Sequence, residues 1–328
     1  MKAGPLRDLL ILTRAPLVAT ALTDGMAGAA LAISTAPAGA ETPASRVALA
    51  LLGSASAYLA GMTFNDVFDY ERDLTLAPDR PLPSGRMSTM TGALIGTGLL
   101  LTAALAAFLL GPVPCAFMAA LCLGVLGYDG LTKRWKIPGA LTMGTCRALN
   151  ILFAGAAVAP HWTPPESLLE GLEFLAREPT AILASESFLY VSGLTLLSCY
   201  EDEEASGLML GVVALALLAP PVGVSVRLFP SSPEGLGMAL AAAGVVCELL
   251  LMGLVLTRLR AAWRDGTMAS GHASTRQLIR GTVLLACGGL LLRGLWPWAL
   301  ACAALVPPYI LGAKAVFSPP TPADGEAG

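Results

Sequence analysis

The chain has 328 residues, of which 55% are hydrophobic and only 13% are charged, and its mean hydropathy is +0.70. Ordinary soluble domains carry about 25% charged residues, so this composition excludes a soluble globular protein and indicates an integral membrane protein. We expect a lipid bilayer around the chain and no nucleic-acid partner. The net charge of −3 is uninformative, because the placement of charge matters more than its sum in a membrane protein.

Apolar runs follow one another along most of the chain, and a helix needs about 20 such residues to cross a bilayer. In chain order the predicted spans are 11–33, 45–65, 90–111, 113–128, 139–159, 181–199, 207–228, 235–258, 278–294 and 296–316. The last two are short and meet at Arg293 and Pro297, so we expect nine or ten spans. The predicted fold class is all-α, a polytopic membrane helix bundle, with residues 1–317 as one transmembrane domain and 318–328 as a disordered tail.

Basic residues are distributed unevenly between the two sides of this predicted bundle. With the N-terminus in the cytoplasm, sixteen of the 20 basic residues fall on the cytoplasmic side, where Lys and Arg are enriched. The exceptions are Arg46, Arg177, Arg227 and Arg293. We therefore predict a bacterial inner-membrane protein whose N-terminus and acidic motifs face the cytoplasm. Residues 164–178 alternate acidic and apolar positions, which predicts an amphipathic segment along the outer surface.

The most acidic stretch follows the second predicted span. Its oxygen-bearing side chains recur at helical spacing at Asn65, Asp66, Asp69 and Asp73. On a helix these positions fall within one stripe about 100° wide. Crowded carboxylates repel one another unless a cation lies between them, and ligation by oxygen alone suits Mg²⁺. A solvated helix end is the plain alternative, although such charge at a membrane boundary is costly.

A second acidic cluster follows the sixth predicted span, on the same side of the membrane. It consists of Glu201, Asp202, Glu203 and Glu204. Two carboxylate clusters on opposing helices would hold metal ions and a diphosphate between them. An ordinary short loop explains the second cluster equally well.

Basic residues on the same side fit a phosphorylated ligand. Lys133 and Arg134 follow the fourth span, and Arg80 lies in a turn that two prolines and Gly85 hold. A diphosphate needs Mg²⁺ on one side and Lys or Arg donors on the other. By contrast, Arg86, Lys136 and the arginines between 258 and 280 are interpreted as topology determinants.

Three polar residues lie deeper in the predicted membrane, Asp24 in the first span and Arg147 and Asn150 in the fifth. Ionisable groups at this depth are expensive and indicate either a functional site or a buried pair. Asp24 and Arg147 would form such a pair, and a position lining the acceptor side of a pocket is the alternative.

Three of these features resemble the motifs of the UbiA superfamily of intramembrane prenyltransferases. They are the Asn-Asp-x-x-Asp-x-x-x-Asp spacing of residues 65–73, the Arg-Pro-Leu-Pro-Ser-Gly turn of residues 80–85, and Tyr128 with Lys133 and Arg134. The stretch that begins at Asp129 also resembles the opening of the CDP-alcohol phosphatidyltransferase signature. The aspartates that complete that signature are missing, which excludes it.

The resemblance implies nine helices around a central cavity and a Mg²⁺-dependent enzyme. Such an enzyme transfers the prenyl group of a polyprenyl diphosphate to a small aromatic or cyclic acceptor. The implied metal ligands are Asn65, Asp66, Asp69, Asp73, Glu201 and Glu204. The implied catalytic residues are Asp66, Asp69 and Lys133. The implied substrate-binding residues are Arg14, Asp24, Arg80, Tyr128, Arg134, Arg147 and Asn150.

The second acidic cluster departs from the Asp-x-x-x-Asp or Asp-x-x-Asp spacing of the family. Together with the stretch from Met143 to Asn150, it is similar to the UbiA-like proteins of Ebo-type gene clusters. A different class of function remains, a membrane transport or export factor that moves a small metabolite through the same cavity. The complete first motif favours the enzyme, because a transporter does not need it.

Overall fold

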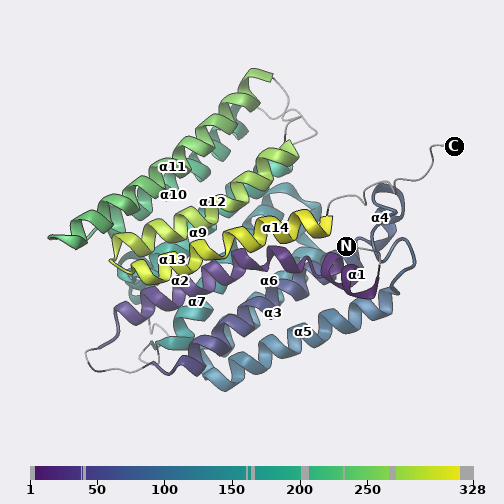
Figure 1. Ribbon diagram of the computed structural model, residues 1–328, viewed down its shortest axis with the longest axis horizontal. Helices are drawn as coiled ribbons and strands as arrows, with labels where there is room; N and C mark the ends of the chain where they lie inside the picture. The colour runs from purple at the N-terminus through teal and green to yellow at the C-terminus, as the bar shows by residue number, and fades with distance from the viewer. Residues whose placement is uncertain are drawn as a thin grey trace.

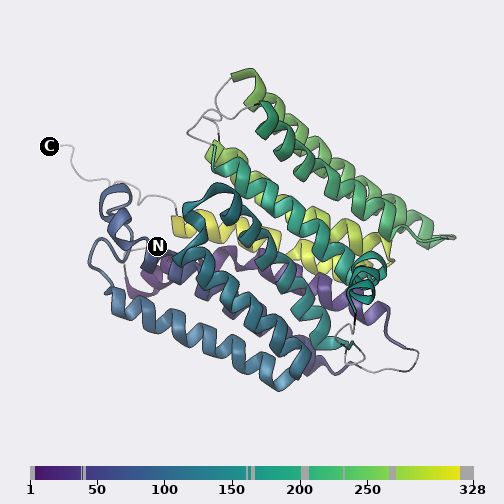
Figure 2. The same cartoon turned by 180° about the vertical axis from the view of Figure 1, so that it is seen from behind.

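The structure is a computed structural model that describes residues 4–37, 39, 42–159, 162–163, 167–200, 207–231, 233–265 and 271–317. Every regular element in these ranges is a helix. The long helices lie side by side, with their axes roughly aligned, and form one bundle (Figure 1 and Figure 2).

The elements of the N-terminal half are α1 (Pro5–Leu12), η1 (Ala15–Val18), α2 (Ala19–Ser34), α3 (Ala44–Phe68), α4 (Tyr70–Leu76), α5 (Thr89–Leu110), α6 (Pro112–Gly130), η2 (Thr132–Arg134) and α7 (Lys136–Val158). Those of the C-terminal half are α8 (Leu168–Arg177), α9 (Pro179–Ser198), α10 (Gly207–Leu228), α11 (Leu236–Asp265), α12 (Gly271–Leu292), α13 (Trp296–Ala304) and α14 (Val306–Phe317).

Capping residues and prolines set the bounds of several of these helices. Ser88 accepts a hydrogen bond from the Thr91 amide and so caps α5. Gly111, with φ of 121°, separates α5 from the proline that opens α6.

The predicted bundle of membrane helices is confirmed. Nine stretches of the described helices are long and apolar enough to cross a membrane, and Gln277–Leu292 forms a further, shorter apolar stretch. The expectation of nine or ten spans therefore agrees with the structure, according to whether this shorter stretch is included.

The spans predicted for 11–33 and 296–316 are present, but each contains a helix break that was not predicted, and proline is the reason in both. The span predicted for 11–33 is broken, because α1 ends at Leu12 and Arg14 adopts a left-handed conformation with φ of 48°. Pro16 follows two residues later and has no N–H to donate to the Leu12 carbonyl, so the α-helical hydrogen bonding of α1 cannot continue there. The last predicted span is split between α13 and α14, where two prolines follow Val306 and cannot continue a helix interior.

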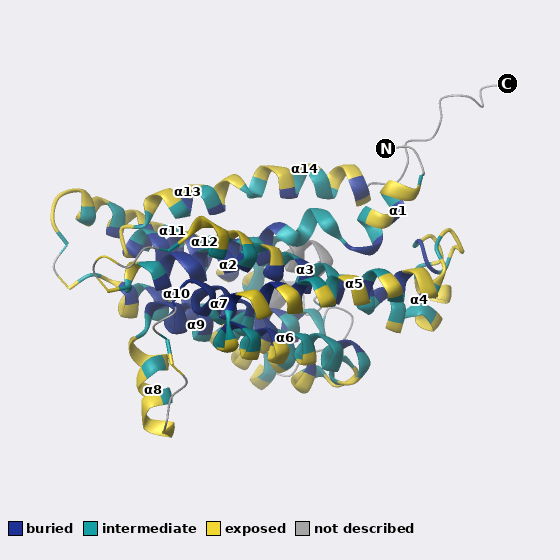
Figure 3. Ribbon diagram, turned by 90° about the horizontal axis from the view of Figure 1, so that it is seen from below, coloured by how far each residue is buried: buried dark blue, intermediate teal, exposed yellow. Residues whose placement is uncertain are grey.

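Small residues let the central helices approach closely. The helix α7 contacts α2, α3, α6 and α9, and many of the buried residues lie in α2, α7 and α9 (Figure 3). Gly28 of α2 lies against the backbone carbonyl oxygen of Ile151 in α7, and a Cβ there would overlap that oxygen. Gly144 of α7 lies in the same way against the backbone carbonyl oxygen of Phe188 in α9, and also against the Ser192 hydroxyl. Such contacts replace the hydrophobic effect as the source of helix association in lipid.

Three of the four basic residues predicted for the outer side have structural partners. Arg46 donates hydrogen bonds to the carbonyl oxygens of Ala157 and Leu110, in the last turns of α7 and α5. A cation at that position also complements the negative end of each helix dipole. Arg227 pairs with Glu186, and Arg177 pairs with a glutamate on its own helix. These arginines pair with helix ends or with glutamates, which explains why they lie outside the predicted cytoplasmic side, where most basic residues are found.

The amphipathic segment predicted for 164–178 contains the helix α8. This helix projects sideways from one end of the bundle, and α1 and α4 lie at the other end (Figure 3). Leu168 and Leu169 are 81% and 75% exposed. The amphipathic character is therefore visible in the structure, and its contact with the outer membrane surface remains a prediction.

We expect Gly28→Ala to lower the stability of the bundle, because the backbone of α7 would have to move away from α2. Overpacking of this kind costs about 1–3 kcal/mol. The matched control is Gly98→Ala, since nothing lies within 4 Å of a Cβ at that position. Thermal unfolding in detergent measures the effect as a lower Tm for the first variant only. Equal Tm values for both variants would contradict the close contact.

Candidate functional site

The acidic stretch crosses the junction of α3 and α4, so the expectation of one continuous helix is corrected at Asp69. This residue lies in the turn between Phe68 and Tyr70. Helical hydrogen bonding nevertheless continues, because the Asp69 amide donates to the Asn65 carbonyl at 3.0 Å and the Asp73 amide donates to the Asp69 carbonyl at 2.8 Å. The three side chains keep their helical spacing and line one cavity together.

Asp66, in the last turn of α3, forms ion pairs with two arginines from other segments of the chain. Its Oδ1 atom lies 3.1 Å from Nη2 of Arg14 and 3.5 Å from Nη1 of Arg80. The same Arg80 nitrogen lies 2.5 Å from Oδ2 of Asp73. The Asp66 side chain is only 4% exposed, so the two cations compensate a charge that water cannot reach. Asp66 lines neither cavity described below, and its role as a metal ligand remains a prediction.

Arg80 is held in position by the turn that carries it. The Ser84 amide and hydroxyl both donate to the Arg80 carbonyl, at 3.0 and 2.6 Å. Gly85 has φ of 72°, a left-handed conformation that favours glycine. Leu82 is 2% exposed and anchors the turn. The turn therefore fixes Arg80 between Asp66 and Asp73.

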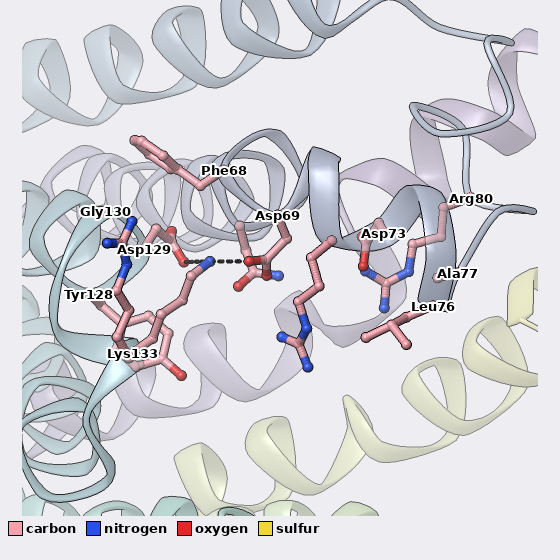
Figure 4. A pocket seen from close by; sticks show the side chains of 13 residues that line it. Phe68, Asp69, Asp73, Leu76, Ala77, Arg80, Tyr128, Asp129, Gly130 and Lys133 are labelled. Carbon is pink, nitrogen blue, oxygen red and sulfur yellow. Dashed lines mark hydrogen bonds and ion pairs between the residues drawn. The ribbon is translucent and has the colours of Figure 1, made fainter.

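Lys133 connects the acidic stretch to the end of α6. Its Nζ atom lies 2.9 Å from Oδ1 of Asp69 and 3.9 Å from Oδ1 of Asp129 (Figure 4). The helix α6 ends at Gly130, and η2 then turns the chain so that Lys133 faces α3. The structure thus brings Lys133 to the acidic stretch, and its catalytic role remains a prediction.

A cavity of about 740 Å³, which we call the outer cavity, lies among these charges. Its lining comprises Asn65, Phe68, Asp69, Arg72, Asp73, Leu76, Ala77, Arg80, Tyr128, Asp129, Gly130, Lys133 and Arg134. Each carboxylate in this lining has a basic partner. Within the described residues, Arg72 and Arg134 line the cavity without a carboxylate partner, which leaves positive charge for an anionic ligand.

A second cavity of about 410 Å³, which we call the inner cavity, lies deeper in the bundle. Residues of η1, α2, α3, α6, α7, α9 and α12 line it. Most of the surface of this cavity is apolar, although about half of the lining residues have polar side chains. Asn65, Tyr128 and Asp129 line both cavities, so the two adjoin at these residues. The site as a whole therefore has a charged part and an apolar part in contact.

The predicted deep residues gather beside the inner cavity. Arg147 lines it, and its Nη1 atom lies 2.7 Å from Oδ2 of Asp24, which is 2% exposed. Asn150 also lines the cavity and donates from Nδ2 to the Ala21 carbonyl at 3.0 Å. Asp24 thus forms the predicted pair and lines neither cavity, whereas Arg147 and Asn150 line the inner one. A role in binding substrate remains a prediction.

The first acidic group offers the donors that Mg²⁺ prefers. Asn65, Asp69 and Asp73 bring carboxylate and amide oxygens to the outer cavity. Within the described residues, no three His, Cys, Asp or Glu side chains converge as a closed metal centre. The physical reason is that the aspartates turn towards Lys133 and Arg80. The donor chemistry fits a site that uses a few carboxylates and leaves other positions to phosphate oxygens.

The predicted second set of metal ligands, Glu201 and Glu204, lies outside the described residues. The last described residue before it is Tyr200, whose ring centroid lies 4.0 Å from Nζ of Lys136. The chain therefore leaves α9 beside the start of α7, next to η2.

Several cavity-lining or buried charged residues were not predicted from the sequence. Asp129 joins both cavities, and Arg72 lines the outer one. Their position beside Tyr128 and Asp73 is the signal that would have indicated them. Glu186 and Glu248 are buried in membrane helices away from both cavities, and their charge within apolar spans was the available signal.

Because Asp66 has two cationic partners, we expect the stability losses caused by replacing Arg14 and Arg80 to be non-additive. Arg14→Gln should lower stability slightly, since Arg80 remains beside Asp66. Arg80→Gln should lower it more, because Asp73 then also loses its basic partner. The double variant should lose about 1–3 kcal/mol more than the sum, because the buried carboxylate then has no partner. Chemical unfolding of the single and double variants in detergent measures the coupling. Strict additivity would contradict a shared partner.

Curated relatives from archaea resemble part of the chain. Over 185 residues it is 31% identical to the digeranylgeranylglyceryl phosphate synthase of Ignicoccus hospitalis, covering 54% of this chain and 58% of that one. Over 114 residues it is 33% identical to the synthase of the same name from Methanobrevibacter smithii, covering 33% and 40%. The chain thus spans about half the length of the curated relatives it matches.

Solved structures share the whole fold. A structure described for digeranylgeranylglyceryl phosphate synthase in membranes has a TM-score of 0.62 at 18% identity, covering 89% of this chain and 99% of that one. A UbiA homologue from Archaeoglobus fulgidus, bound to DMAPP and Mg²⁺, has a TM-score of 0.59 at 14% identity, covering 88% and 99%. The sequence profile of the UbiA prenyltransferase family matches residues 25–265, which is more than half of the chain. The protein therefore belongs to the UbiA prenyltransferase family.

Proposed function

We propose that this protein is a Mg²⁺-dependent prenyltransferase that uses a prenyl diphosphate as its donor. The observation that carries the proposal is the contact between a charged outer cavity and a mainly apolar inner cavity at Asn65, Tyr128 and Asp129. A prenyl diphosphate has the same division into an anionic head and an apolar chain. The head would occupy the outer cavity, and the reacting carbon would lie near the shared residues.

The outer cavity supplies both kinds of partner that a diphosphate needs. Arg72 and Arg134 have no carboxylate partner within the described part of the chain and are available to phosphate oxygens. Asn65, Asp69 and Asp73 would hold Mg²⁺ on the opposite side of the head. Bound Mg²⁺ would supply positive charge to the departing diphosphate.

Transfer requires one bond to break and one to form. The bond between the allylic carbon and the diphosphate oxygen breaks, and the electron pair leaves with the diphosphate. The acceptor then bonds to that carbon and releases a proton. The cationic side chains stabilise the charge that develops on the leaving group. The apolar inner cavity keeps water away from the reactive carbon.

Similar proteins support the donor class. Structures of the Archaeoglobus fulgidus homologue are described with DMAPP and Mg²⁺ and with GPP and Mg²⁺. The archaeal relatives carry the name of a digeranylgeranylglyceryl phosphate synthase, a lipid synthase. The predicted aromatic or cyclic acceptor and the relation to the Ebo-type branch stay predictions. Nothing in the described part of the chain specifically favours the export alternative.

We also propose that the outer cavity faces the cytoplasm of a bacterial cell. The basis is the sixteen basic residues assigned to that side, together with the structural use of three of the four exceptions at the other end. A water-soluble diphosphate would then reach the outer cavity directly from the cytoplasm.

Replacing Lys133 by Gln is expected to lower the transfer rate by about 10²–10³-fold, since it removes a cationic donor from the leaving-group side. Asp69→Asn should have a similar effect. The matched control is Arg177→Gln, which removes an exposed cation from α8 at the far end of the bundle. Labelled prenyl diphosphates of several chain lengths, incubated in lipid nanodiscs with a panel of acceptors, measure the rate. Unchanged turnover in both site variants would sink the proposal.

Chelation of divalent ions is expected to abolish transfer and to weaken binding of a non-hydrolysable prenyl diphosphate analogue. Added Mg²⁺ should restore both. Asp73→Asn should raise the Mg²⁺ concentration needed for half-maximal activity, because one ligand is weakened. Full activity in excess EDTA would contradict a metal-dependent reaction.

A further inference from the structure

Every charged residue that lines the inner cavity has an opposite charge beside it. Arg14 lies 3.1 Å from Asp66, and Arg147 lies 2.7 Å from Asp24. Asp129 is 3.9 Å from Lys133. The outer cavity differs, because Arg72 and Arg134 line it without a carboxylate partner in the described residues. Of the two cavities, only the outer one therefore carries positive charge without a carboxylate partner among the described residues.

The inner cavity also presents polar atoms that lack a partner. The Oδ1 atom of Asn150 and the Oγ atom of Ser54 make no hydrogen bond within the described residues, although these residues are only 5% and 1% exposed. Both residues line the inner cavity. Because the Asn150 amide nitrogen already donates to Ala21, the free atom is an acceptor that requires a hydroxyl or N–H donor. A buried polar atom without a partner is costly, so a ligand that fills this need gains affinity.

From these observations we propose that the inner cavity binds the uncharged polar end of the acceptor, a hydroxyl or amide-like group, and that Asp24 excludes anionic groups. This inference rests on the proposed function, because the bound group is called an acceptor only if the protein catalyses prenyl transfer. Arg147 can still donate hydrogen bonds to a neutral oxygen. A carboxylate or phosphate beside Arg147 would instead place a second negative charge next to Asp24, away from water, which is unfavourable. Any acidic group of the acceptor belongs in the outer cavity, near Arg72 and Arg134.

The test compares two probes of nearly equal size and shape, benzamide and benzoate. Binding to the purified full chain in lipid nanodiscs is measured by ligand-observed NMR, with empty nanodiscs subtracted. The wild-type protein should bind benzamide at least about tenfold more tightly than benzoate. Asp24→Asn, which keeps the size of the side chain, should tighten benzoate binding about tenfold and leave benzamide nearly unchanged.

A double variant separates charge from shape. Asp24→Asn with Arg147→Gln removes both charges, and the gain in benzoate binding should disappear. Equal binding of both probes by the wild type would overturn the inference, and so would an absence of benzamide binding or a lack of any benzoate gain in Asp24→Asn. Thermal unfolding shows whether each variant is folded. If a variant is not folded, the comparison of benzamide and benzoate binding by the wild type still tests the inference. Because binding needs neither Mg²⁺ nor turnover, a failed transfer assay would remove the proposed reaction and leave this preference intact.

Discussion

The need to neutralise carboxylates at the edge of a lipid-embedded bundle organises this protein. Asp66, Asp69 and Asp73 cannot be hydrated freely there, so each draws a cation from another part of the chain. Arg14 comes from the segment before α2, and Lys133 comes from the turn after α6. The ion pairs therefore bring separate segments to one place, and that place is the outer cavity. Folding and ligand binding depend on the same charges, which makes the site sensitive to anything that competes for its arginines and lysines.

The two cavities differ in whether the charged residues that line them have partners of opposite charge. The outer cavity keeps spare positive charge, and the inner cavity has each charge matched, with hydrogen-bonding atoms left free. A substrate that is anionic at one end and apolar at the other fits only one way round. Asn65, Tyr128 and Asp129 stand at the boundary, where a bond between a phosphate oxygen and a carbon would lie. In the proposed reaction, the charge distribution as a whole would therefore set the orientation of the donor.

The acidic stretch and its cations were predictable from sequence because they depend on local spacing. Helical period groups Asn65, Asp69 and Asp73, and the two prolines define the turn that carries Arg80. The number of spans followed from apolar length alone. The break at Arg14 and the division of the last helix were missed, because apolar length alone does not show where a proline inside an apolar run interrupts the helix. Whether Asp24 pairs with Arg147 or lines a pocket could not be decided from sequence either, because only the crossing of α2 and α7 sets that distance.

That crossing has a consequence for how the protein could change its acceptor. Gly28 and Ile151, whose backbones touch, each lie one helical turn beyond Asp24 and Arg147 on the same two helices. The spacing of the two helices at the glycine therefore sets the reach between the carboxylate and the guanidinium. A larger residue at position 28 would loosen this pair and alter the electrostatic character of a cavity that position 28 does not line. The proposed acceptor preference would then change through the backbone, at a residue that lines neither cavity.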